Sequence, residues 1–570
     1  MKHPLTLTLP ALLASALALA GIAGAAATLT ATDDVRIVLL HTNDIHGQLL
    51  PRMLRGRGGD EAQPVGGAAA IDAVVKQERA RAKSTGAHVL LLDSGDWYQG
   101  TPEGNHKKEG AEGAVVVDWM NRAGFDAAVI GNHEFDFGLA NLRTLMARAK
   151  FTVLGANVVA PVAAGGAASA GGDSKAPIAK PYVVLDRGGV KIALLGILDS
   201  DTPRMVAKGR MGDVTIPDEI EQSRLWFDRA RKESDVVVML THCGKDTDRK
   251  IAERVPEAPV ILGGHNHERI RQPYFVEHEP AALKSTSWKS DLPPRTYILQ
   301  SGARAENLDR VELWIDPSDR RIRRIETKVT SLDVKIVGED EETKKWIEAE
   351  TAEVTKALDR VLAQVEPPAA AAEKGQRTDP TSNFMTDAML WFARQTDPTV
   401  VAAFGNGGGV RAKLETGGLT ARRCYEIVPF DNSLVLLTLS GTDLAQVLGE
   451  SFTGDRPGRA LSAGVVGVIR RAGDGRFDLS DVRIQGKAFD PAATYRVAAN
   501  SFIAEGKGGF PTFAKGTDRV DTGVLVRDTL MEYATAVKRL ALDDVLRLRF
   551  DGAGSAKPAS VPAGAGAGGR

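Results

Sequence analysis

The sequence predicts an α/β protein in which helices cover the sheets and the chain divides into two domains. Short apolar runs alternate with amphipathic helical patterns, which is the rhythm of βαβ units. Five of these apolar runs are followed by residues of the kinds that bind metals. The chain has 570 residues, too many for one hydrophobic core, so a second domain is expected.

The composition is ordinary for a globular protein, with 43% hydrophobic and 25% charged residues. A formal net charge of −1 argues against a broad electrostatic surface for polymeric nucleic acid or an anionic membrane. The two cysteines, Cys243 and Cys424, lie far apart and do not form a disulfide scaffold, so free or buried thiols are expected. The sequence leaves the oligomeric state open.

The N-terminal residues 1–27 have the pattern of a signal peptide. A weakly basic start is followed by an apolar stretch over 5–20 and by small residues over 23–27. The apolar stretch is too short and wrongly flanked for a spanning helix, although an uncleaved anchor is the alternative. No later run is long enough to span a bilayer. We therefore expect an exported protein, periplasmic or extracellular, without a membrane span in the mature chain.

The first domain is expected over residues 33–332. Apolar runs predict strands, and helical spacing of apolar residues predicts helices between them. The expected strands are 35–40, 88–92, 127–130, 153–156, 191–198, 236–240, 260–262, 297–300, 311–315 and 322–329, with helices at 67–83, 114–122 and 139–150. Residues 160–180, rich in Ala, Gly and Ser, indicate a flexible surface insertion, and 279–294 a loop.

A linker helix is expected within residues 333–373. A charged amphipathic pattern runs over 339–366 and is ended by two prolines; its apolar stripe comprises Ile347, Val354, Leu358, Val361 and Val365. The second domain, 374–552, should open with a helix capped by Thr381 or Ser382. Strands follow at 400–404, 434–439 and 495–499. The tail 553–570 is mostly Gly, Ala, Ser and Pro, which indicates disorder.

Metal-ligating residues follow five strands of the first domain. In open α/β sheets the ligand site lies beyond the carboxyl ends of the strands, so these residues should converge. They are Asp44 and His46, Asp96, Asn132 with His133, His242, and His265 with His267. Each motif alone has a bland interpretation: Asp-x-His is often a surface pair, Gly-Asp a turn and His242 a core histidine. All five in order, each after a strand, rarely arise by chance.

This set holds more donors than one divalent ion needs. It fits two ions bridged by a carboxylate, and Asp96 is the natural bridge because a carboxylate has two oxygens. Mixed nitrogen and oxygen ligands suit zinc, manganese or cobalt. Two cations would neutralise a phosphate ester and lower the pKa of a bound water, which becomes the nucleophile. A metal-activated water attack on phosphorus is therefore predicted.

The order of these motifs resembles the calcineurin-like metallophosphoesterase superfamily. The opening His41-Thr42-Asn43-Asp44 and the run 131–136, Gly-Asn-His-Glu-Phe-Asp, are similar to the secreted 5′-nucleotidase / UDP-sugar hydrolase family. The resemblance covers nearly all of the mature chain. It implies a layered β-sandwich with flanking helices for the first domain, then a linker helix and a smaller α/β domain.

The resemblance also implies roles for individual residues. One metal would be held by Asp44, His46, Asp96 and His267, and the other by Asp96, Asn132, His242 and His265. Some relatives carry an amide at the position of His267. His133 and Asp136 would form a catalytic dyad, with Asp136 fixing the imidazole. From the residues alone, Asp136 could instead be a helix-capping carboxylate.

Three stretches of the second domain offer a specificity surface. A Gly-rich turn over 405–411 carries Asn406 and Arg411, whose guanidinium suits a phosphate. An equally good interpretation is a tight loop with a solvated arginine. Phe430 and Phe502 each lie beside polar residues; a lone Phe usually belongs to a core. Members of the resembled family sandwich the base between the two matching Phe rings. Asn432 would then hydrogen-bond the base edge.

One stretch departs from the family pattern. Where relatives carry an Asp that holds the ribose hydroxyls, this chain has Gly508, preceded by Lys507. A positive charge there would favour a substrate with an extra phosphate. The prediction is a secreted dinuclear-metal phosphohydrolase that acts on nucleoside 5′-monophosphates and extends to nucleotide diphosphates or UDP-sugars. The alternatives are a 2′,3′-cyclic-nucleotide 2′-phosphodiesterase/3′-nucleotidase and a non-enzymatic nucleotide-binding protein.

Overall fold

A computed structural model describes residues 34–54, 62–161, 175–206, 209–279, 290–368, 378–452, 460–471 and 477–551. The predicted signal peptide and C-terminal tail lie outside these residues. So do most of the predicted insertion over 160–180 and most of the predicted loop over 279–294. In the part of the chain that is described, no helix is both long and apolar enough to cross a bilayer.

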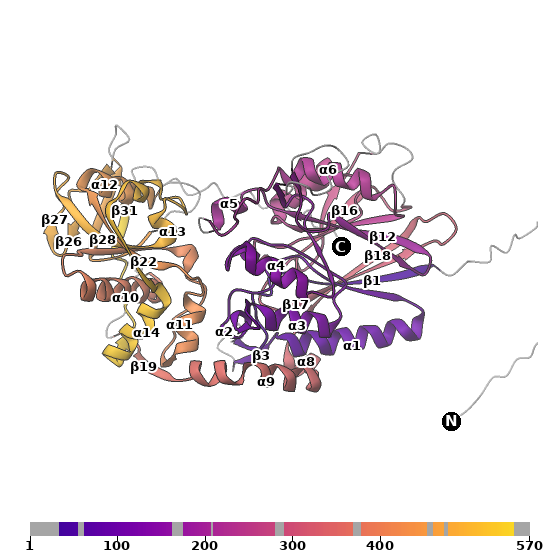
Figure 1. Cartoon of the computed structure of the whole chain (residues 1–570), viewed down its shortest axis with the longest axis horizontal. Coiled ribbons are helices and arrows are strands. Elements are labelled where there is room, and N and C mark those ends of the chain that lie inside the picture. Colours follow the sequence, from indigo (N-terminus) through magenta and orange to yellow (C-terminus); the bar gives the residue numbers. More distant parts are fainter. Residues whose placement is uncertain are drawn as a thin grey trace, which may run out of the picture.

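Two six-stranded sheets form the first domain (Figure 1). The first has the order β18 (Ile322–Ser331), β17 (Asn307–Ile315), β1 (Val35–Thr42), β4 (His88–Asp93), β7 (Ala127–Val129) and β8 (Thr152–Leu154). The second has the order β11 (Tyr182–Arg187), β12 (Val190–Leu198), β13 (Val236–His242), β14 (Val260–Leu262), β16 (Arg295–Leu299) and β15 (Tyr274–Glu277). From β1 to β8, and from β12 to β16, neighbouring strands are parallel.

Successive side chains along each strand point to opposite faces of the sheet, so each sheet packs on both faces. The first domain therefore has four layers, which are two sheets and a layer of helices outside each. Ile37 and Leu39 of β1 share one buried cluster with Ile192 and Leu194 of β12, so this cluster fills the space between the sheets. The opposite face of the first sheet packs on α1 (Ala68–Thr85), α3 (Ala114–Ala123) and α4 (Leu139–Arg148). The outer face of the second sheet packs on α6 (Glu219–Ala230) and α7 (Lys245–Arg254). The predicted layered sandwich with flanking helices is confirmed.

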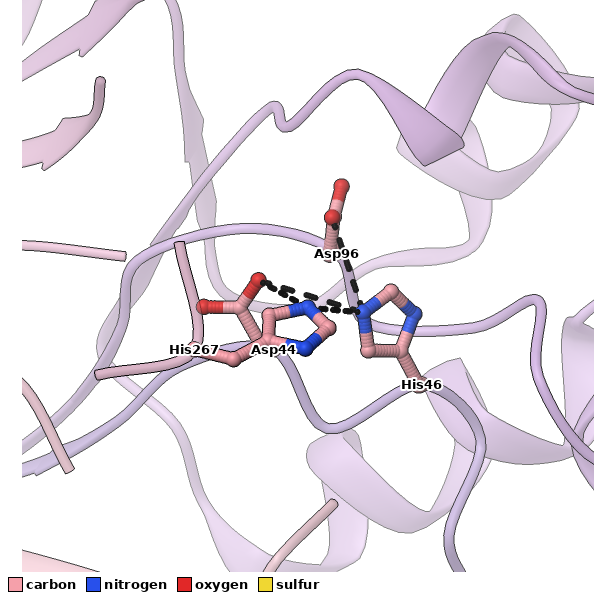
Figure 2. Close-up of side chains that lie close together, drawn as sticks. All are labelled: Asp44, His46, Asp96 and His267. Carbon is pink, nitrogen blue, oxygen red and sulfur yellow. Dashed lines mark hydrogen bonds and ion pairs between the residues drawn. The ribbon is translucent and has the colours of Figure 1, made fainter. Parts of the chain in front are cut away.

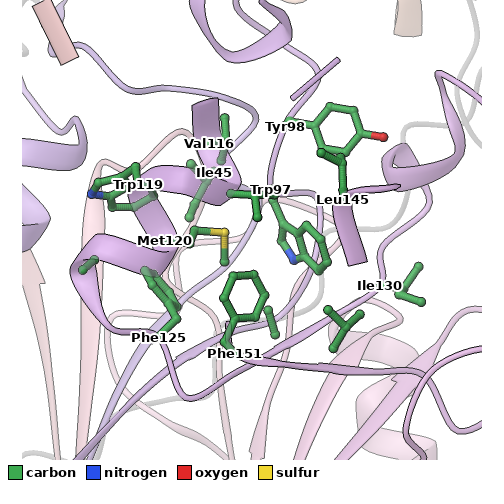
Figure 3. Close-up of a cluster of buried hydrophobic side chains, with 14 of the residues drawn as sticks. Ile45, Trp97, Tyr98, Val116, Trp119, Met120, Phe125, Ile130, Leu145 and Phe151 are labelled. Carbon is green, nitrogen blue, oxygen red and sulfur yellow. The ribbon is translucent and has the colours of Figure 1, made fainter. Parts of the chain in front are cut away.

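Aromatic side chains support the loop that follows β4 (Figure 3). Trp97 and Tyr98 come directly after Asp96, and both are fully buried. Trp97 meets Phe151 edge-on with ring centroids 5.8 Å apart, and Phe137 stacks on Tyr98 at 5.8 Å. Removing such a ring from a core typically costs about 3–5 kcal/mol. These rings therefore anchor the backbone on which Asp96 is presented.

The second domain is a smaller α/β unit. Its main sheet has the order β23 (Ala460–Ala463), β20 (Ala402–Asn406), β28 (Thr494–Asn500), β22 (Ser433–Ser440) and β29 (Thr517–Leu525). α10 (Pro380–Thr396) and α14 (Val526–Val537) cover one face, and α12 (Gly441–Glu450) covers the other. A further small sheet contains β24 (Val465–Arg471), β25 (Phe477–Asp478), β26 (Arg483–Ile484), β27 (Lys487–Ala488) and β31 (Leu548–Asp551).

The connection between the domains differs from the predicted single helix. α8 (Val334–Val337) and α9 (Glu341–Leu358) are helical, but β19 (Val361–Glu366) is a strand. It pairs with β21 (Gly417–Thr420) and β30 (Arg539–Ala541), and these backbone partners override the helical pattern of the sequence. Ile347 is buried as predicted. The cap of α10 is Asp379, whose carboxylate accepts from the Thr381 amide, rather than Thr381 or Ser382.

Candidate metal centre and substrate cavity

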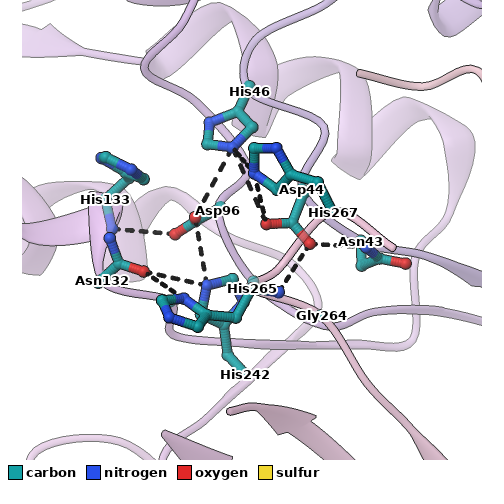
Figure 4. Close-up of polar contacts among 12 residues, drawn as sticks. Asn43, Asp44, His46, Asp96, Asn132, His133, His242, Gly264, His265 and His267 are labelled. Atoms are coloured by element: carbon teal, nitrogen blue, oxygen red, sulfur yellow. Dashed lines mark hydrogen bonds and ion pairs between the residues drawn. The ribbon is translucent and has the colours of Figure 1, made fainter. Parts of the chain in front are cut away.

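The five predicted strand ends meet between the two sheets of the first domain. β1, β4 and β7 are neighbours in one sheet, and β13 and β14 are neighbours in the other. Their carboxyl ends carry, in chain order, Asp44 and His46, Asp96, Asn132, His242, and His265 with His267. All seven side chains lie in one group (Figure 4).

One part of this group comprises Asp44, His46, Asp96 and His267, whose ligand atoms all lie within 4.8 Å of one another (Figure 2). The Nε2 atoms of His46 and His267 are 2.9 Å apart. His267 Nε2 lies 3.2 Å from Asp44 Oδ1, and His46 Nε2 lies 3.7 Å from Asp96 Oδ2. These atoms face a common point, which is the arrangement that a bound cation requires.

The other part comprises Asp96, Asn132, His242 and His265. His242 Nε2 lies 3.2 Å from Asp96 Oδ2 and 3.2 Å from Asn132 Oδ1. His265 approaches Asn132 Oδ1 through its Nδ1, at 3.0 Å. Because Asp96 Oδ2 faces both His46 and His242, the carboxylate of Asp96 occupies the position expected of a bridge between two sites.

Backbone carbonyls fix the tautomers of two of the histidines. His46 Nδ1 donates to the Gln99 carbonyl at 2.8 Å, and His242 Nδ1 donates to the Ser94 carbonyl at 2.6 Å. A carbonyl only accepts, so Nδ1 of each ring carries a proton, and Nε2 is the nitrogen that faces the group. Metal-binding histidines usually have such a partner on the second nitrogen.

The residues fit a divalent cation on two further grounds. Asp44 Oδ1 is buried without a hydrogen-bond partner, a costly state unless another group satisfies it. Burial alone would raise the pKa of Asp44, but the nearby imidazoles of His267 and His242 lower it to about 2. The carboxylate is therefore charged at neutral pH. Carboxylate, amide and imidazole donors together suit zinc, manganese or cobalt.

The backbone of the loops is strained where the ligands lie. Asp44, His46, Asp96, His265 and His267 all have positive φ, a region that few residues other than glycine adopt. Gly131 lies close to one of the ligands: a Cβ there would lie 2.3 Å from Asp96 Oδ1. A side chain at 131 would therefore displace the carboxylate of Asp96.

Glu134 holds two of these loops together, a role that sequence reasoning missed. Its buried carboxylate accepts from the amides of Asp96, at 2.9 Å, Trp97, at 2.8 Å, and Gly131, at 2.6 Å. Burial and the nearby Asp96 raise the pKa of Glu134 to about 8. Its place in the Gly-Asn-His-Glu motif was the available signal, but only the contacts show what the side chain does.

His133 and Asp136 lie together at the edge of the group. His133 begins the short helix η1 (His133–Phe135), and its Nδ1 lies 2.6 Å from Asp136 Oδ2. Burial lowers the pKa of His133, but the carboxylates of Asp136 and Asp96 outweigh burial and raise it to about 9. The alternative role of Asp136 as a helix cap is not realised, because Gly138 occupies the N-cap of α4 without a side-chain bond.

The predicted substrate residues of the second domain line a cavity together with part of this group of seven predicted ligands, which is called the metal group below. The cavity has a volume of about 440 Å³. Its walls include Asn406, Arg411, Phe430, Asn432 and Phe502 from the second domain, and Asp96, Asn132, His133, Asp136, His265 and His267 from the first. The sequence-predicted residues of both domains therefore share one space.

Phe430 makes a contact that the sequence did not predict. Its ring stacks on the imidazole of His133, with centroids 5.6 Å apart and planes 25° apart. The guanidinium carbon of Arg411 lies 4.9 Å from the centre of the same ring. In this conformation, Phe430 therefore contacts His133 of the predicted dyad. Phe502, on α13 (Ser501–Ala504), lines the cavity without a ring partner among the described residues.

Lys507 and Gly508 lie close to Phe502 in the chain, but their contacts differ from those predicted. Lys507 Nζ donates to the carbonyl of Val206 in the first domain, and Lys507 lines a neighbouring cavity. Gly508 has a φ of +67°, and a Cβ there would lie 2.8 Å from the Phe502 ring. This backbone therefore has no room for an aspartate at position 508. The expected extra positive charge does not come from Lys507.

Comparison with known proteins links both domains to described families. Residues 37–269 match the family described as calcineurin-like phosphoesterase, and residues 358–515 match 5′-nucleotidase, C-terminal domain. Protein UshA of Escherichia coli (strain K12) is 25% identical over 524 residues, which cover 87% of this chain and 90% of that protein. The 5′-nucleotidase of Vibrio cholerae is 26% identical over 540 residues, which cover 88% and 90%.

A solved structure extends the similarity to both domains. The 5′-nucleotidase precursor from Thermus thermophilus has a TM-score of 0.74 at 26% sequence identity. The match covers 90% of this chain and 99% of the Thermus chain. The order and arrangement of both domains are therefore common to the two proteins.

Proposed function

Because this chain belongs to the 5′-nucleotidase family, in which a calcineurin-like phosphoesterase domain precedes a 5′-nucleotidase C-terminal domain, we propose that it removes phosphate from nucleoside 5′-monophosphates. The chain is a metal-dependent phosphoric ester hydrolase that acts on nucleotides. One observation carries the finer assignment: a single cavity joins the metal-ligating group to the two Phe residues and Arg411. Nucleotide diphosphates and UDP-sugars are further proposed substrates.

The proposed metal ligands are Asp44, His46, Asp96 and His267 for one divalent ion, and Asp96, Asn132, His242 and His265 for a second. When bound, two such ions would neutralise the phosphate charge and lower the pKa of a water molecule. The chain itself supplies the orientation: the ligand side chains are held by backbone amides and carbonyls before any substrate arrives. Such fixed donors need little reorganisation during the reaction.

His133 is proposed as the proton donor. Its raised pKa keeps the imidazole charged near neutral pH, and Asp136 on Nδ1 leaves Nε2–H free to reach an oxygen of the substrate. Hydrolysis breaks the bond between phosphorus and the ester oxygen while water adds to phosphorus. The leaving oxygen then needs a proton, and His133 would give it. Arg411 would pair with the phosphoryl oxygens.

The second domain would select the nucleoside. A base that enters the cavity would stack on Phe502 and on the exposed part of Phe430, and stacking tolerates any base because every base has a π-face. Asn432 would hydrogen-bond the base edge. Asn406, whose Oδ1 accepts from Asn500 at 2.9 Å, would position the nucleotide. Export to the periplasm or the extracellular space is proposed from the signal-peptide pattern over residues 1–27.

A second activity, that of a 2′,3′-cyclic-nucleotide 2′-phosphodiesterase/3′-nucleotidase, is favoured by one observation. Position 508 carries no carboxylate, and a Cβ there would meet Phe502. A ribose that bears a phosphate would therefore meet no negative charge from this residue. A substrate panel separates the two activities.

The test measures phosphate release by the purified mature protein from AMP, 3′-AMP, 2′,3′-cyclic AMP and UDP-glucose, with metal analysis of the same sample. Turnover of AMP that is faster than turnover of 3′-AMP and of 2′,3′-cyclic AMP, lost with EDTA and restored by a divalent cation, is the expected result. Preference for the cyclic or 3′-nucleotide would replace the proposal by the second activity. Undiminished turnover in EDTA would overturn the metal assignment.

A further inference from the structure

Two arginines in the wall of the cavity have no acidic partner among the described residues. Its three aspartates are each paired: Asp96 with His242 at 3.2 Å, Asp136 with His133 at 2.6 Å, and Asp431 with Arg527 at 2.5 Å. Two arginines in the cavity wall, Arg210 and Arg411, form no ion pair or side-chain hydrogen bond with any described residue. An unpaired guanidinium at a cavity wall suits an anionic ligand.

The two arginines come from different domains, and both line the same cavity. The charges of Asp44, Asp96 and Asp136 act on Arg411, which places it beside the metal group. Arg210 belongs to the first domain, and its carbonyl accepts from the Leu139 amide at 2.8 Å. Arg210 lines the wall together with Phe137, Met205 and Phe502. One phosphoryl group at the metals would engage Arg411 and leave Arg210 unused.

A backbone hydrogen bond holds Arg210 beside α4. The Leu139 amide fixes it against the start of α4, three residues after Asp136. Four residues before Arg210, the carbonyl of Val206 accepts from Lys507 Nζ of the second domain. This contact joins Val206 to the second domain. A guanidinium on a backbone fixed in this way loses less freedom when it binds.

We propose that Arg210 binds a second phosphoryl group of the substrate, so that nucleotides with two phosphoryl groups are preferred to nucleoside monophosphates. This inference rests on the proposed function, because it assumes that the first phosphoryl group lies at the metals. The second group has two possible sources. It is either the inner phosphate of a 5′-diphosphate or a phosphate on the ribose 3′ oxygen. Both present anionic oxygens that a planar guanidinium pairs with.

The experiment compares Arg210→Gln with the wild type on AMP, ADP and adenosine 3′,5′-bisphosphate. The control is Arg204→Gln, in α5 (Thr202–Met205), whose side chain is 83% exposed and pairs with Asp201 at 3.0 Å. R210Q should lower kcat/KM for a doubly phosphorylated nucleotide about 10- to 100-fold, the range of a charge-assisted hydrogen bond, and for AMP by less than about threefold. R204Q should change none of these values.

The pattern of losses identifies the source of the second group. A loss for ADP alone assigns the inner phosphate, and a loss for the bisphosphate alone assigns the ribose phosphate. Equal losses for all three substrates, or none, would overturn the inference while leaving AMP hydrolysis, and thus the proposed function, intact. If the wild type hydrolyses no nucleotide, the proposed function fails separately. In that case, calorimetric titration of His133→Ala protein with AMP and the bisphosphate tests Arg210 by binding alone. His133→Ala protein should bind the bisphosphate more tightly than AMP, and the added R210Q substitution should abolish this difference in affinity.

Discussion

The metal group and the substrate cavity are built on opposite principles. In the metal group, backbone amides hold one oxygen of each carboxylate: Asp44 Oδ2 accepts from the His265 amide at 2.9 Å, and Asp96 Oδ1 accepts from the His133 amide at 2.9 Å. In the cavity, the guanidinium groups of Arg210 and Arg411 have no ionic or hydrogen-bonding partner among the described residues. The side chains of the metal group are therefore held in place before a ligand binds, whereas the two guanidinium groups of the cavity remain available to bind the ligand.

The largest effect should come from Asp96→Ala, because Asp96 faces both proposed ion positions. We expect activity to fall by more than the roughly 10²–10⁴-fold that a positioned proton donor contributes, together with loss of bound metal. Metal analysis and phosphate release measure both. Asp228→Asn on α6, where Asp228 pairs with Arg224, is the matched control. Full metal content in D96A would remove the bridge from the assignment.

His133→Ala tests whether chemistry can be lost while the metal group stays intact. We expect kcat to fall about 10²–10⁴-fold with unchanged metal content, since His133 contributes its backbone amide, and not its ring, to the hydrogen bond with Asp96. His88→Ala, at the opposite end of β4, should leave kcat unchanged. Unaltered kcat in H133A would refute the role of proton donor.

Phe502→Ala probes the selecting end alone. Loss of a stacking surface worth about 1–3 kcal/mol should raise KM for AMP about tenfold or more. Hydrolysis of p-nitrophenyl phosphate, which carries no nucleobase, should change less than about threefold, because it gains nothing from base stacking. Phe275→Ala removes an exposed ring of the first domain and serves as control. Equal losses on both substrates would mean that Phe502 supports the fold rather than the base.

The smallest effect concerns α9, which belongs to the connection between the two domains. Asp72 on α1 accepts from Thr343 Oγ1 at 2.6 Å, and burial raises its pKa from 3.8 to about 6. The folded state therefore holds a proton that the unfolded state has released between about pH 4 and pH 6, so this contribution to stability is lost as pH rises through that window.

Asp72→Asn removes this titration. The stability of D72N relative to the wild type should increase between about pH 4.5 and pH 7, as measured by urea unfolding at both values. The ratio of kcat/KM for ADP to that for AMP should stay the same, since Asp72 contacts neither region. Thr343→Val removes only the hydroxyl donor, and it should retain the wild-type direction of the pH dependence. A relative stability of D72N that does not change with pH would contradict the raised pKa.

The sequence predicted that the side chains of the metal group would lie together because they follow strand ends, and parallel strands bring their carboxyl ends to one edge; their role as metal ligands stays a prediction. It also placed Arg411, Phe430 and Phe502 on one cavity, but through family resemblance rather than spacing. The strand β19 was missed because its partners, β21 and β30, lie far away in the chain. The sequence did not predict the role of Glu134, the place of Arg210 or the contact of Lys507 for the same reason. Each depends on contacts between distant segments.

On the proposed function, the stack of Phe430 on His133 would couple recognition of the base to the proton donor. A ring that supports the base would also limit how the imidazole can rotate, so the arrival of a nucleoside would affect the proposed proton donor without any movement of the ions. Substitutions at 430 would then alter turnover as well as affinity. A nucleotide that fits poorly would not only bind weakly; it would also leave the imidazole aimed away from the bond that must break.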